Sequence, residues 1–81
     1  MEDNMENLLN ILVKDLILKP EALRIEKADP ATDGLIVYRV VVDESDMGRV
    51  IGKHGRTVAQ IRSIVKTAAL KNDMKIAVEV G

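Results

Sequence analysis

Two glycines separated by two residues lie near the middle of the chain, in the segment Gly52-Lys53-His54-Gly55. A residue without a Cβ atom lets a ligand approach within hydrogen-bonding distance of the peptide backbone. A helix that begins at Arg56 would present free amides and the positive end of its dipole to an anion. Lys53 and Arg56 add mobile positive charge at the same place. The segment therefore favours contact with a phosphodiester chain.

Large aliphatic residues flank the two glycines. Val50 and Ile51 come directly before them, and Val58 and Ile61 follow at helical spacing. We expect Ile51 and Val58 to line a groove for bases, and Ile61 and Ile64 to lie in the core or in an interface. The chain contains one Tyr and neither Phe nor Trp, which argues against an aromatic stacking platform.

The charge of the chain is distributed unevenly, although its formal net value is only −1. Residues 1–46 contain 11 Asp and Glu against 5 Lys and Arg, whereas residues 47–81 contain 7 Lys and Arg against 2 Asp and Glu. Between Met47 and Asn72 there is no acidic residue. The cations of that stretch are Arg49, Lys53, Arg56, Arg62, Lys66 and Lys71. This asymmetry indicates a polyanion partner on one face, with Arg49 extending the patch around Lys53 and Arg56.

The sequence gives little support for a disulfide, a metal site or a catalytic site. The chain has no Cys, which excludes disulfides and thiolate metal sites, and its one His lies in the segment between the glycines. A lone His54 does not make a metal site, although at a loop tip it could stack on a base or titrate near neutral pH. The sequence shows no catalytic set and no Walker-type loop. We therefore expect neither an enzyme nor a cofactor.

Six elements are predicted along residues 1–81, in the order α-β-β-α-α-β. Apolar residues at helical spacing predict a helix over residues 3–18, capped by Asp3 or Asn4, and Lys19-Pro20 ends it. Period-two alternation and β-branched residues predict strands over residues 22–27, 35–42 and 74–80, with 35–42 in the centre. Helices are predicted over residues 47–51 and 56–70, the second with Val58, Ile61, Ile64, Val65 and Ala68 facing inward.

These elements predict one α+β domain, in which helices cover one face of a three-stranded mixed sheet. A chain of 81 residues has room for one domain with a modest core. No apolar run reaches the ~18 residues that span a bilayer, and the N-terminus is acidic rather than basic. We expect a cytoplasmic protein with no membrane partner.

The segment from Val50 to Val58, with Ile61, resembles the signature of the KH domain. The first helix and the last strand resemble its type II, bacterial, arrangement. Over residues 5–80 the chain is similar to the KhpA (YlqC) family of small bacterial KH proteins. The matching stretches are Asn7-Leu8-Leu9, Pro20-Glu21-Ala22-Leu23, Asp46 to Lys53, Gly55-Arg56-Thr57 and Ile61-Arg62. Many relatives have Gln or Lys where this chain has His54.

The resemblance implies a cytoplasmic protein that binds single-stranded RNA, and an RNA chaperone that acts as a homodimer or with the larger KH protein KhpB. It also implies a link to cell elongation, cell shape and the cell wall and envelope. With the residue patterns above, it assigns RNA contact to Gly52, Lys53, His54, Gly55, Arg56, Arg49, Ile51 and Val58.

Two alternatives remain open from the sequence. In one, the domain serves to dimerise with another protein through an exposed sheet edge or the helix over residues 56–70, and RNA contact is incidental. In the other, the helices over residues 47–51 and 56–70 form a helix-turn-helix for DNA, although two glycines in the turn fit this poorly.

Overall fold

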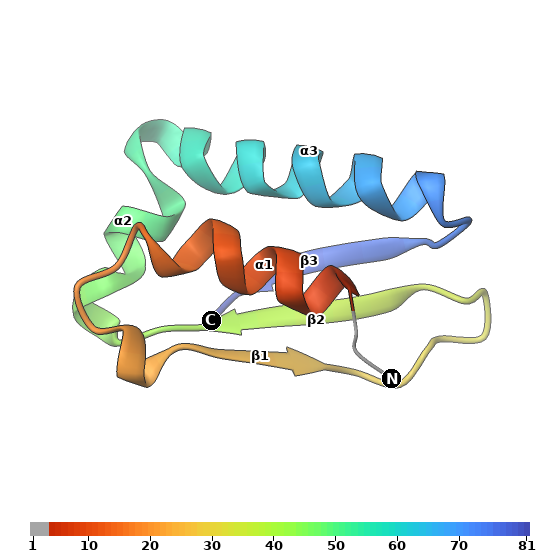
Figure 1. Ribbon diagram of the computed structural model, residues 1–81, viewed down its shortest axis with the longest axis horizontal. Helices are drawn as coiled ribbons and strands as arrows, with labels where there is room; N and C mark the ends of the chain where they lie inside the picture. Colours follow the sequence, from red (N-terminus) through yellow and green to blue (C-terminus); the bar gives the residue numbers. More distant parts are fainter. Residues whose placement is uncertain (1–3) are drawn as a thin grey trace.

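The computed structural model describes residues 4–81. Its elements follow the predicted order, with three short 3₁₀ turns between them (Figure 1). The helices are α1 (Asn4–Lys14), α2 (Met47–Ile51) and α3 (Arg56–Lys71), the strands are β1 (Arg24–Lys27), β2 (Ile36–Val41) and β3 (Ile76–Val80), and the 3₁₀ turns are η1 (Pro20–Ala22), η2 (Glu44–Asp46) and η3 (Lys53–Gly55).

The three strands form one mixed sheet in the order β1-β2-β3, so β2 is central as predicted. β1 pairs antiparallel with β2, with Arg24 opposite Val41, and β2 pairs parallel with β3, with Tyr38 opposite Val78. A parallel neighbour needs a crossover connection, which here is supplied by α2 and α3. The helices lie on one face of the sheet, which confirms the predicted α+β layers (Figure 1).

The core lies between this helical layer and the covered face of the sheet. Alternate residues of the strands point into it because side chains of a strand alternate between its two faces. The core residues are Met5, Leu9 and Val13 from α1 and Ile17 after it, Tyr38, Val40, Ile76 and Val78 from the sheet and Val42 after β2, and Val50, Ile61, Val65 and Ala69 from the later helices. The core thus joins α3 to both β2 and β3, which fixes the start of α3 relative to the sheet.

The predicted first helix is too long at its C-terminal end, because α1 ends at Lys14 rather than at residue 18. The amides of Leu18 and Lys19 donate hydrogen bonds to the Asp46 carboxylate, at 3.1 and 3.0 Å. Those amides are therefore directed at a distant side chain and not along a helix. Of the two proposed caps, Asp3 lies outside the described residues.

Three further predictions need correction. The first strand begins at Arg24 rather than at residue 22, because Pro20–Ala22 forms a 3₁₀ turn, and the last strand begins at Ile76 rather than at residue 74. Ile64 does not face inward, since 47% of it is exposed. The inner face of α3 is centred on Ile61 and Val65, and Ile64 falls at its border.

Among residues 4–81, no helix combines the length and the apolar character needed to cross a membrane.

Candidate nucleic-acid interface

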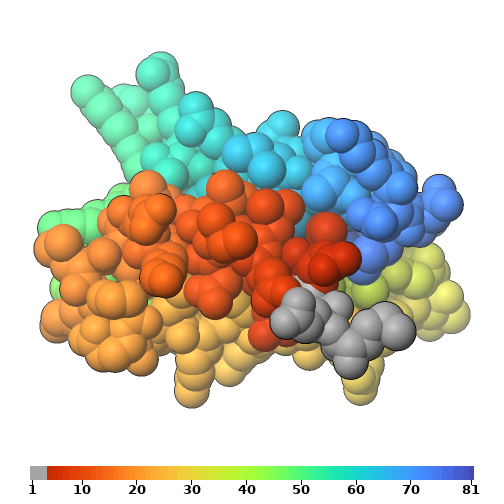
Figure 2. Space-filling view, viewed as in Figure 1, coloured from red at the N-terminus to blue at the C-terminus, as the bar shows by residue number. Residues whose placement is uncertain are grey.

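The turn η3 connects α2 to α3 and stands at one end of the helical layer (Figure 1). It contains the loop predicted to contact phosphate, Gly52-Lys53-His54-Gly55. Lys53 and His54 are exposed and both glycines are partly exposed. In Figure 2 the green-to-teal region of the chain projects beyond the rest of the molecule at the top left. The loop is therefore accessible to a large ligand.

Three of the four positions of this loop place the backbone in conformations with positive φ. Gly52 has φ 77° and ψ 170°, a combination that is essentially restricted to glycine. Gly55 has φ 72° and ψ 15°, in the left-handed region, and His54 has φ 57° and ψ 26°. A side chain in the left-handed region is strained, although His is one of the types enriched there. Both glycines are thus required by backbone conformation as well as by access.

Gly52 has a second constraint, because a Cβ atom at this position would collide with Thr57. The nearest atoms are the Thr57 side-chain oxygen and Cβ, and the Thr57 backbone nitrogen would lie 2.8 Å away. At Gly55 a Cβ atom would meet nothing within 4 Å. The two glycines of the loop therefore differ. The absence of a side chain at Gly52 lets the chain pack against the start of α3, whereas a side chain at Gly55 would extend into unoccupied space.

The hydrogen bonds that hold the loop are donated by three amides. Gly52 N donates to Gly48 O at 2.9 Å, Gly55 N donates to Gly52 O at 3.1 Å, and Arg56 N donates to Lys53 O. The amides of Lys53 and His54 begin the turn, where no earlier carbonyl of the same turn is available to them. No side chain caps either η3 or α3. The loop keeps amides available to an anion.

The cations expected at the loop are exposed, but they are not equivalent. Lys53 and Arg56 are exposed beside the glycines. Arg49 is also exposed, yet its Nε lies 3.9 Å from Oδ1 of Asp46, a long ion pair. Asp46 is only 1% exposed. Arg49 is therefore partly neutralised, and Lys53 and Arg56 dominate the charge of the loop.

The two aliphatic residues expected to contact bases differ in access. Ile51 is 37% exposed at the end of α2, directly before the loop. Val58 is 8% exposed and lies on the buried face of α3. Ile51 can thus present a surface to a base, whereas Val58 has little exposed surface to offer one. Within residues 4–81, no cluster of three or more His, Cys, Asp or Glu side chains could hold a metal ion.

Two polar contacts near the loop were not anticipated from the sequence. The Asp46 carboxylate accepts from both Leu18 N and Lys19 N, and so ties the start of α2 to the segment after α1. Arg62 Nε donates to the backbone oxygen of Val78 at 3.0 Å and ties α3 to the edge strand β3. Both contacts join residues far apart in the chain, which a local sequence pattern cannot reveal.

One carboxyl near α2 has a shifted pKa. The hydroxyl and the amide of Ser45 both donate to Asp43 Oδ2, at 2.6 and 3.0 Å. These bonds lower the pKa of Asp43 from its ordinary value, with a smaller contribution from the Lys19 ammonium 3.5 Å away. Asp43 thus stabilises the turn before α2.

Comparison with known proteins places this geometry in a family. The family model described as KhpA/KhpB, KH domain, matches residues 6–80. The RNA-binding protein KhpA of Streptococcus pneumoniae serotype 4 is 48% identical over 63 residues, which cover 78% of this chain and 77% of that protein. KhpA of Listeria monocytogenes serovar 1/2a is 42% identical over 94% of this chain and 97% of its own length. KhpA of Clostridium perfringens is 38% identical over 94% and 99%.

Solved structures of Era share the fold. The Aquifex aeolicus Era structure superposes with a TM-score of 0.65 at 15% identity, over 94% of this chain and 29% of that chain. Era in complex with MgGDPNP and nucleotides 1506–1542 of 16S ribosomal RNA gives a TM-score of 0.64 at 16% identity, over 94% and 28%. The chain spans less than a third of Era, and the likeness concerns the fold alone. The sequence relatives and the family model carry the assignment: the chain belongs to the KhpA/KhpB KH-domain family.

Proposed function

We propose that this protein binds single-stranded RNA, with the phosphates held at the Gly52-Lys53-His54-Gly55 loop and the start of α3. The observation that carries the proposal is the accessible backbone of the loop, which combines positive-φ glycines, uncapped amides and the exposed cations Lys53 and Arg56. KH domains clamp about four nucleotides at such a loop. The name shared by the relatives, RNA-binding protein KhpA, supports the same ligand.

Within this site the residues have different roles. The amides of the loop and Arg56 contact phosphate, and Lys53 adds mobile charge. His54 lies at the loop tip, and Arg49 contributes less because of its ion pair with Asp46. The exposed Ile51, with the largely buried Val58, supports a base. Three or four phosphate contacts would give a slope of log K against log salt of roughly −2 to −3. A module of this size binds at about micromolar level.

The test is the double substitution Lys53→Asp with His54→Asp. Asp is tolerated in the left-handed conformation of His54, so the fold is preserved while the loop becomes anionic. We expect RNA binding to be lost in a fluorescence titration. The matched control, Asn10→Asp with Lys14→Glu, makes the same charge change at exposed positions of α1. RNA affinity equal to that of the native protein in the folded loop variant would refute the assignment.

The same titration separates RNA from DNA. Single-stranded RNA and duplex DNA are compared at equal salt, because the electrostatic part of binding depends on salt. Preference for the single strand is expected, since the turn between α2 and α3 contains two positive-φ glycines and α2 has only 5 residues. Preference for duplex DNA would favour the helix-turn-helix alternative.

We further propose that the protein acts in pairs, as a homodimer or with a KhpB-like KH protein. Exposed aliphatic side chains on the helical layer support this, namely Ile11 and Ile64, with Leu18 after α1. Pairing would raise the effective concentration of a weak RNA site. The family resemblance supports the finer roles of an RNA chaperone in the cytoplasm that influences cell elongation and the envelope.

Mass measurement by size-exclusion chromatography with light scattering, combined with an RNA titration, tests the pairing. A dimer that binds RNA is the expected result. A tight complex with no measurable RNA affinity would instead favour a protein-interaction module. Crosslinking in cells, followed by sequencing of the attached RNA and identification of co-purified proteins, would identify the targets and the partner.

A further inference from the structure

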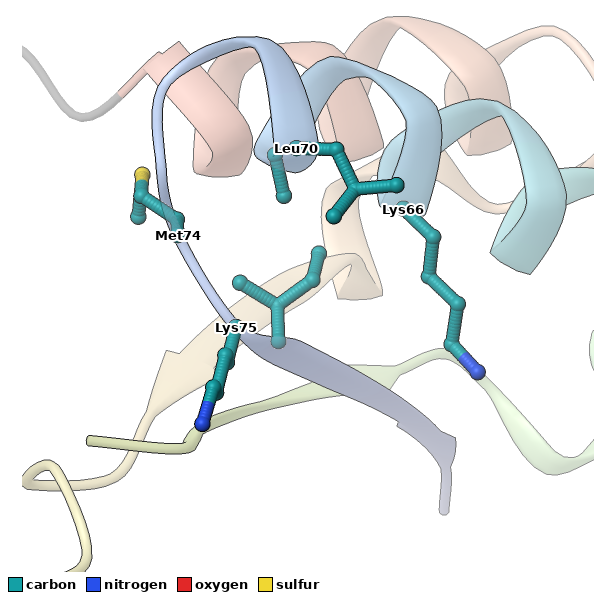
Figure 3. A pocket seen from close by; sticks show the side chains of 6 residues that line it. Lys66, Leu70, Met74 and Lys75 are labelled. Carbon is teal, nitrogen blue, oxygen red and sulfur yellow. The ribbon is translucent and has the colours of Figure 1, made fainter. Parts of the chain in front are cut away.

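The two outer strands of the sheet differ in what lies at their free edges. At the edge of β3, Arg62 Nε donates to Val78 O, so a side chain of α3 already occupies a backbone acceptor. The cleft beside that edge has two lysines, Lys66 and Lys75, on its sides (Figure 3). β1 forms the opposite edge of the sheet, and among residues 4–81 no strand lies beyond it.

The directions of the β1 backbone groups follow from its register with β2. Ala28 N donates to Val37 O at 2.9 Å, so these opposite residues are a hydrogen-bonded pair of the ladder. In an antiparallel ladder such pairs alternate with pairs that are not hydrogen-bonded. Arg24 and Glu26 therefore bond to β2, whereas the amide and the carbonyl of Ile25 face the free edge. Ile25 thus presents one donor and one acceptor to a further strand.

A depression lies along the same edge, between α1 and β1, which is the lowest strand in Figure 1. Its volume is about 380 Å³, and it is lined by Glu6, Asn10, Leu23, Arg24, Ile25 and Glu26. Leu23 and Ile25 are partly buried against the core and give the depression an aliphatic part. A strand added beside Ile25 would therefore find room for a side chain on the covered face of the sheet.

The other face of β1 carries one charge of each sign. Arg24 and Glu26 alternate with Ile25, so their side chains project from the open face of the sheet. They are 68% and 51% exposed, and Arg24 Nη2 lies 3.6 Å from Glu26 Oε2. Opposite charges directly across a strand pair stabilise it, and like charges weaken it. The best antiparallel neighbour thus has a base opposite Glu26, an aliphatic residue opposite Ile25 and an acid opposite Arg24.

We propose that the free edge of β1 binds an extended segment of a partner protein as a fourth, antiparallel strand, with a basic, an aliphatic and an acidic residue in that order. Ile25 exchanges both backbone hydrogen bonds with the aliphatic residue, whose side chain enters the depression beside Leu23. In such complexes the backbone bonds supply affinity and the alternate side chains supply specificity. The inference does not rest on RNA binding, because the loop and α3 take no part in it.

A second copy of the chain is the competing occupant, because Arg24-Ile25-Glu26 itself has the required order. A two-fold pairing of the two edges at Ile25 would turn the two depressions toward each other. Glu6 of each copy would then approach Glu6 of the other, since this residue lines the depression. A peptide segment without a helix above it brings no such like charge. The structure therefore favours a partner segment.

The experiment is an NMR titration of the native protein with two capped peptides that differ only in the order of their charges. The first is Thr-Thr-Lys-Val-Glu-Thr-Thr and the second is Thr-Thr-Glu-Val-Lys-Thr-Thr. We expect the first to bind at about millimolar level and to slow hydrogen exchange of the Ile25 amide. The second should bind roughly fivefold more weakly. Equal affinities, or preference for the second, overturn the register, and absence of shifts along β1 overturns the site.

Substitution of Ile25 tests the backbone contact. Ile25→Pro removes the outward amide without removing a bond to β2, and should abolish binding of the first peptide. Ile25→Ala keeps that amide and is the matched control, which should retain part of the affinity. Circular dichroism establishes that both variants are folded. Native affinity in a folded Ile25→Pro variant overturns the proposal.

Neutralisation of the charges tests the side-chain contacts without touching the backbone. Arg24→Gln/Glu26→Gln should bind the two peptides equally, whereas Arg39→Gln/Glu79→Gln, which removes another exposed ion pair of the sheet, should keep the preference. A preference that persists in the first variant overturns the register. Light scattering over a range of protein concentrations tests the competing occupant. A dimer that Ile25→Pro converts to a monomer would place a second copy at this edge and overturn the partner segment.

Discussion

The turns on the two sides of α2 have the same length and opposite chemistry. Glu44–Asp46 precedes α2 and Lys53–Gly55 follows it, and each is a 3₁₀ turn of three residues. The first is acidic and closed by side chains, because Asp43 accepts from Ser45 and Asp46 accepts from two distant amides. The second is basic, has no side-chain cap and is shaped by residues with positive φ.

The difference predicts that the two turns have different roles, one in stability and one in the proposed contact with RNA. Near the first turn, carboxylates satisfy backbone amides that would otherwise remain without a partner inside the protein. At the second turn, the conformation is fixed by glycine and by packing on Thr57, so amides stay available for an outside anion. Substitutions of the carboxylates at the first turn should therefore change stability with little effect on RNA binding, and charge reversal at Lys53 and His54 should change RNA binding. Gly52 is an exception at the second turn, because its contact with Thr57 ties it to stability as well.

The largest effect is expected for Asp46→Ala. Two amides, those of Leu18 and Lys19, lose their acceptor, and the free energy of unfolding should fall by about 3 kcal/mol. Urea denaturation followed by circular dichroism measures the change. The free energy of unfolding of Asp46→Asn should lie between those of the native protein and Asp46→Ala, because the Asn side chain retains only one acceptor oxygen.

RNA titration of the folded fraction of Asp46→Ala sharpens the comparison. Its affinity should stay close to that of the native protein, since Arg49 is released while Lys53 and Arg56 are unchanged. If Asp46→Ala kept the stability of the native protein but lost RNA binding, the roles assigned to the two turns would be reversed.

The next effect separates the two glycines. Gly52→Ala should destabilise the protein by about 2–3 kcal/mol, because it adds a collision with Thr57 to a backbone conformation that alanine avoids. Gly55→Ala should cost only about 1 kcal/mol, since the left-handed strain is not accompanied by a collision. Thermal unfolding of both variants provides the comparison. Equal losses would show that the contact with Thr57 is unimportant.

The sequence predicted the elements around the second turn better than those around the first. The helix over residues 47–51 and the start of the next helix at Arg56 agree with the structure, because glycine positions and aliphatic spacing are local signals. The role of Asp46 was missed, because its partners lie 27 and 28 residues earlier in the chain. The end of α1 was misplaced for the same reason.

The predicted loop residues do come together, but the sequence could not tell how each would be presented. Helical spacing placed Ile64 inside, although it lies at the border of the buried face. The spacing also gave no sign that Arg49 would form an ion pair with Asp46. Likewise, Arg62 was one of several cations on α3 until the structure showed its bond to Val78. Periodicity in a sequence predicts which face of a helix is buried, but it does not predict which residues of other elements contact that helix.

A smaller effect is expected for His54→Gly in the second turn. His54 holds a left-handed conformation that glycine adopts without strain, so the free energy of unfolding should rise by about 0.5 kcal/mol after the entropic disadvantage of glycine. If His54 has no specific contact, RNA affinity should remain within about twofold of the native value. A larger loss of affinity, in a variant at least as stable as the native protein, would assign a direct contact to the imidazole.

The smallest effect concerns Asp43 and Ser45 in the first turn, and it depends on pH. The pKa of Asp43 is lowered in the folded protein from its ordinary value of 3.8, chiefly by the Ser45 hydroxyl. A carboxyl with a lowered folded-state pKa contributes stability above its unfolded pKa and loses that contribution as pH falls through the folded value. The coupling between Asp43→Asn and Ser45→Ala in a double-mutant cycle should therefore be constant from neutral pH to about pH 5 and shrink as the pH drops below 3.8. Equilibrium unfolding of the four proteins across this range measures it, and a coupling that grows on acidification would show that the protonated carboxyl is the form this turn prefers.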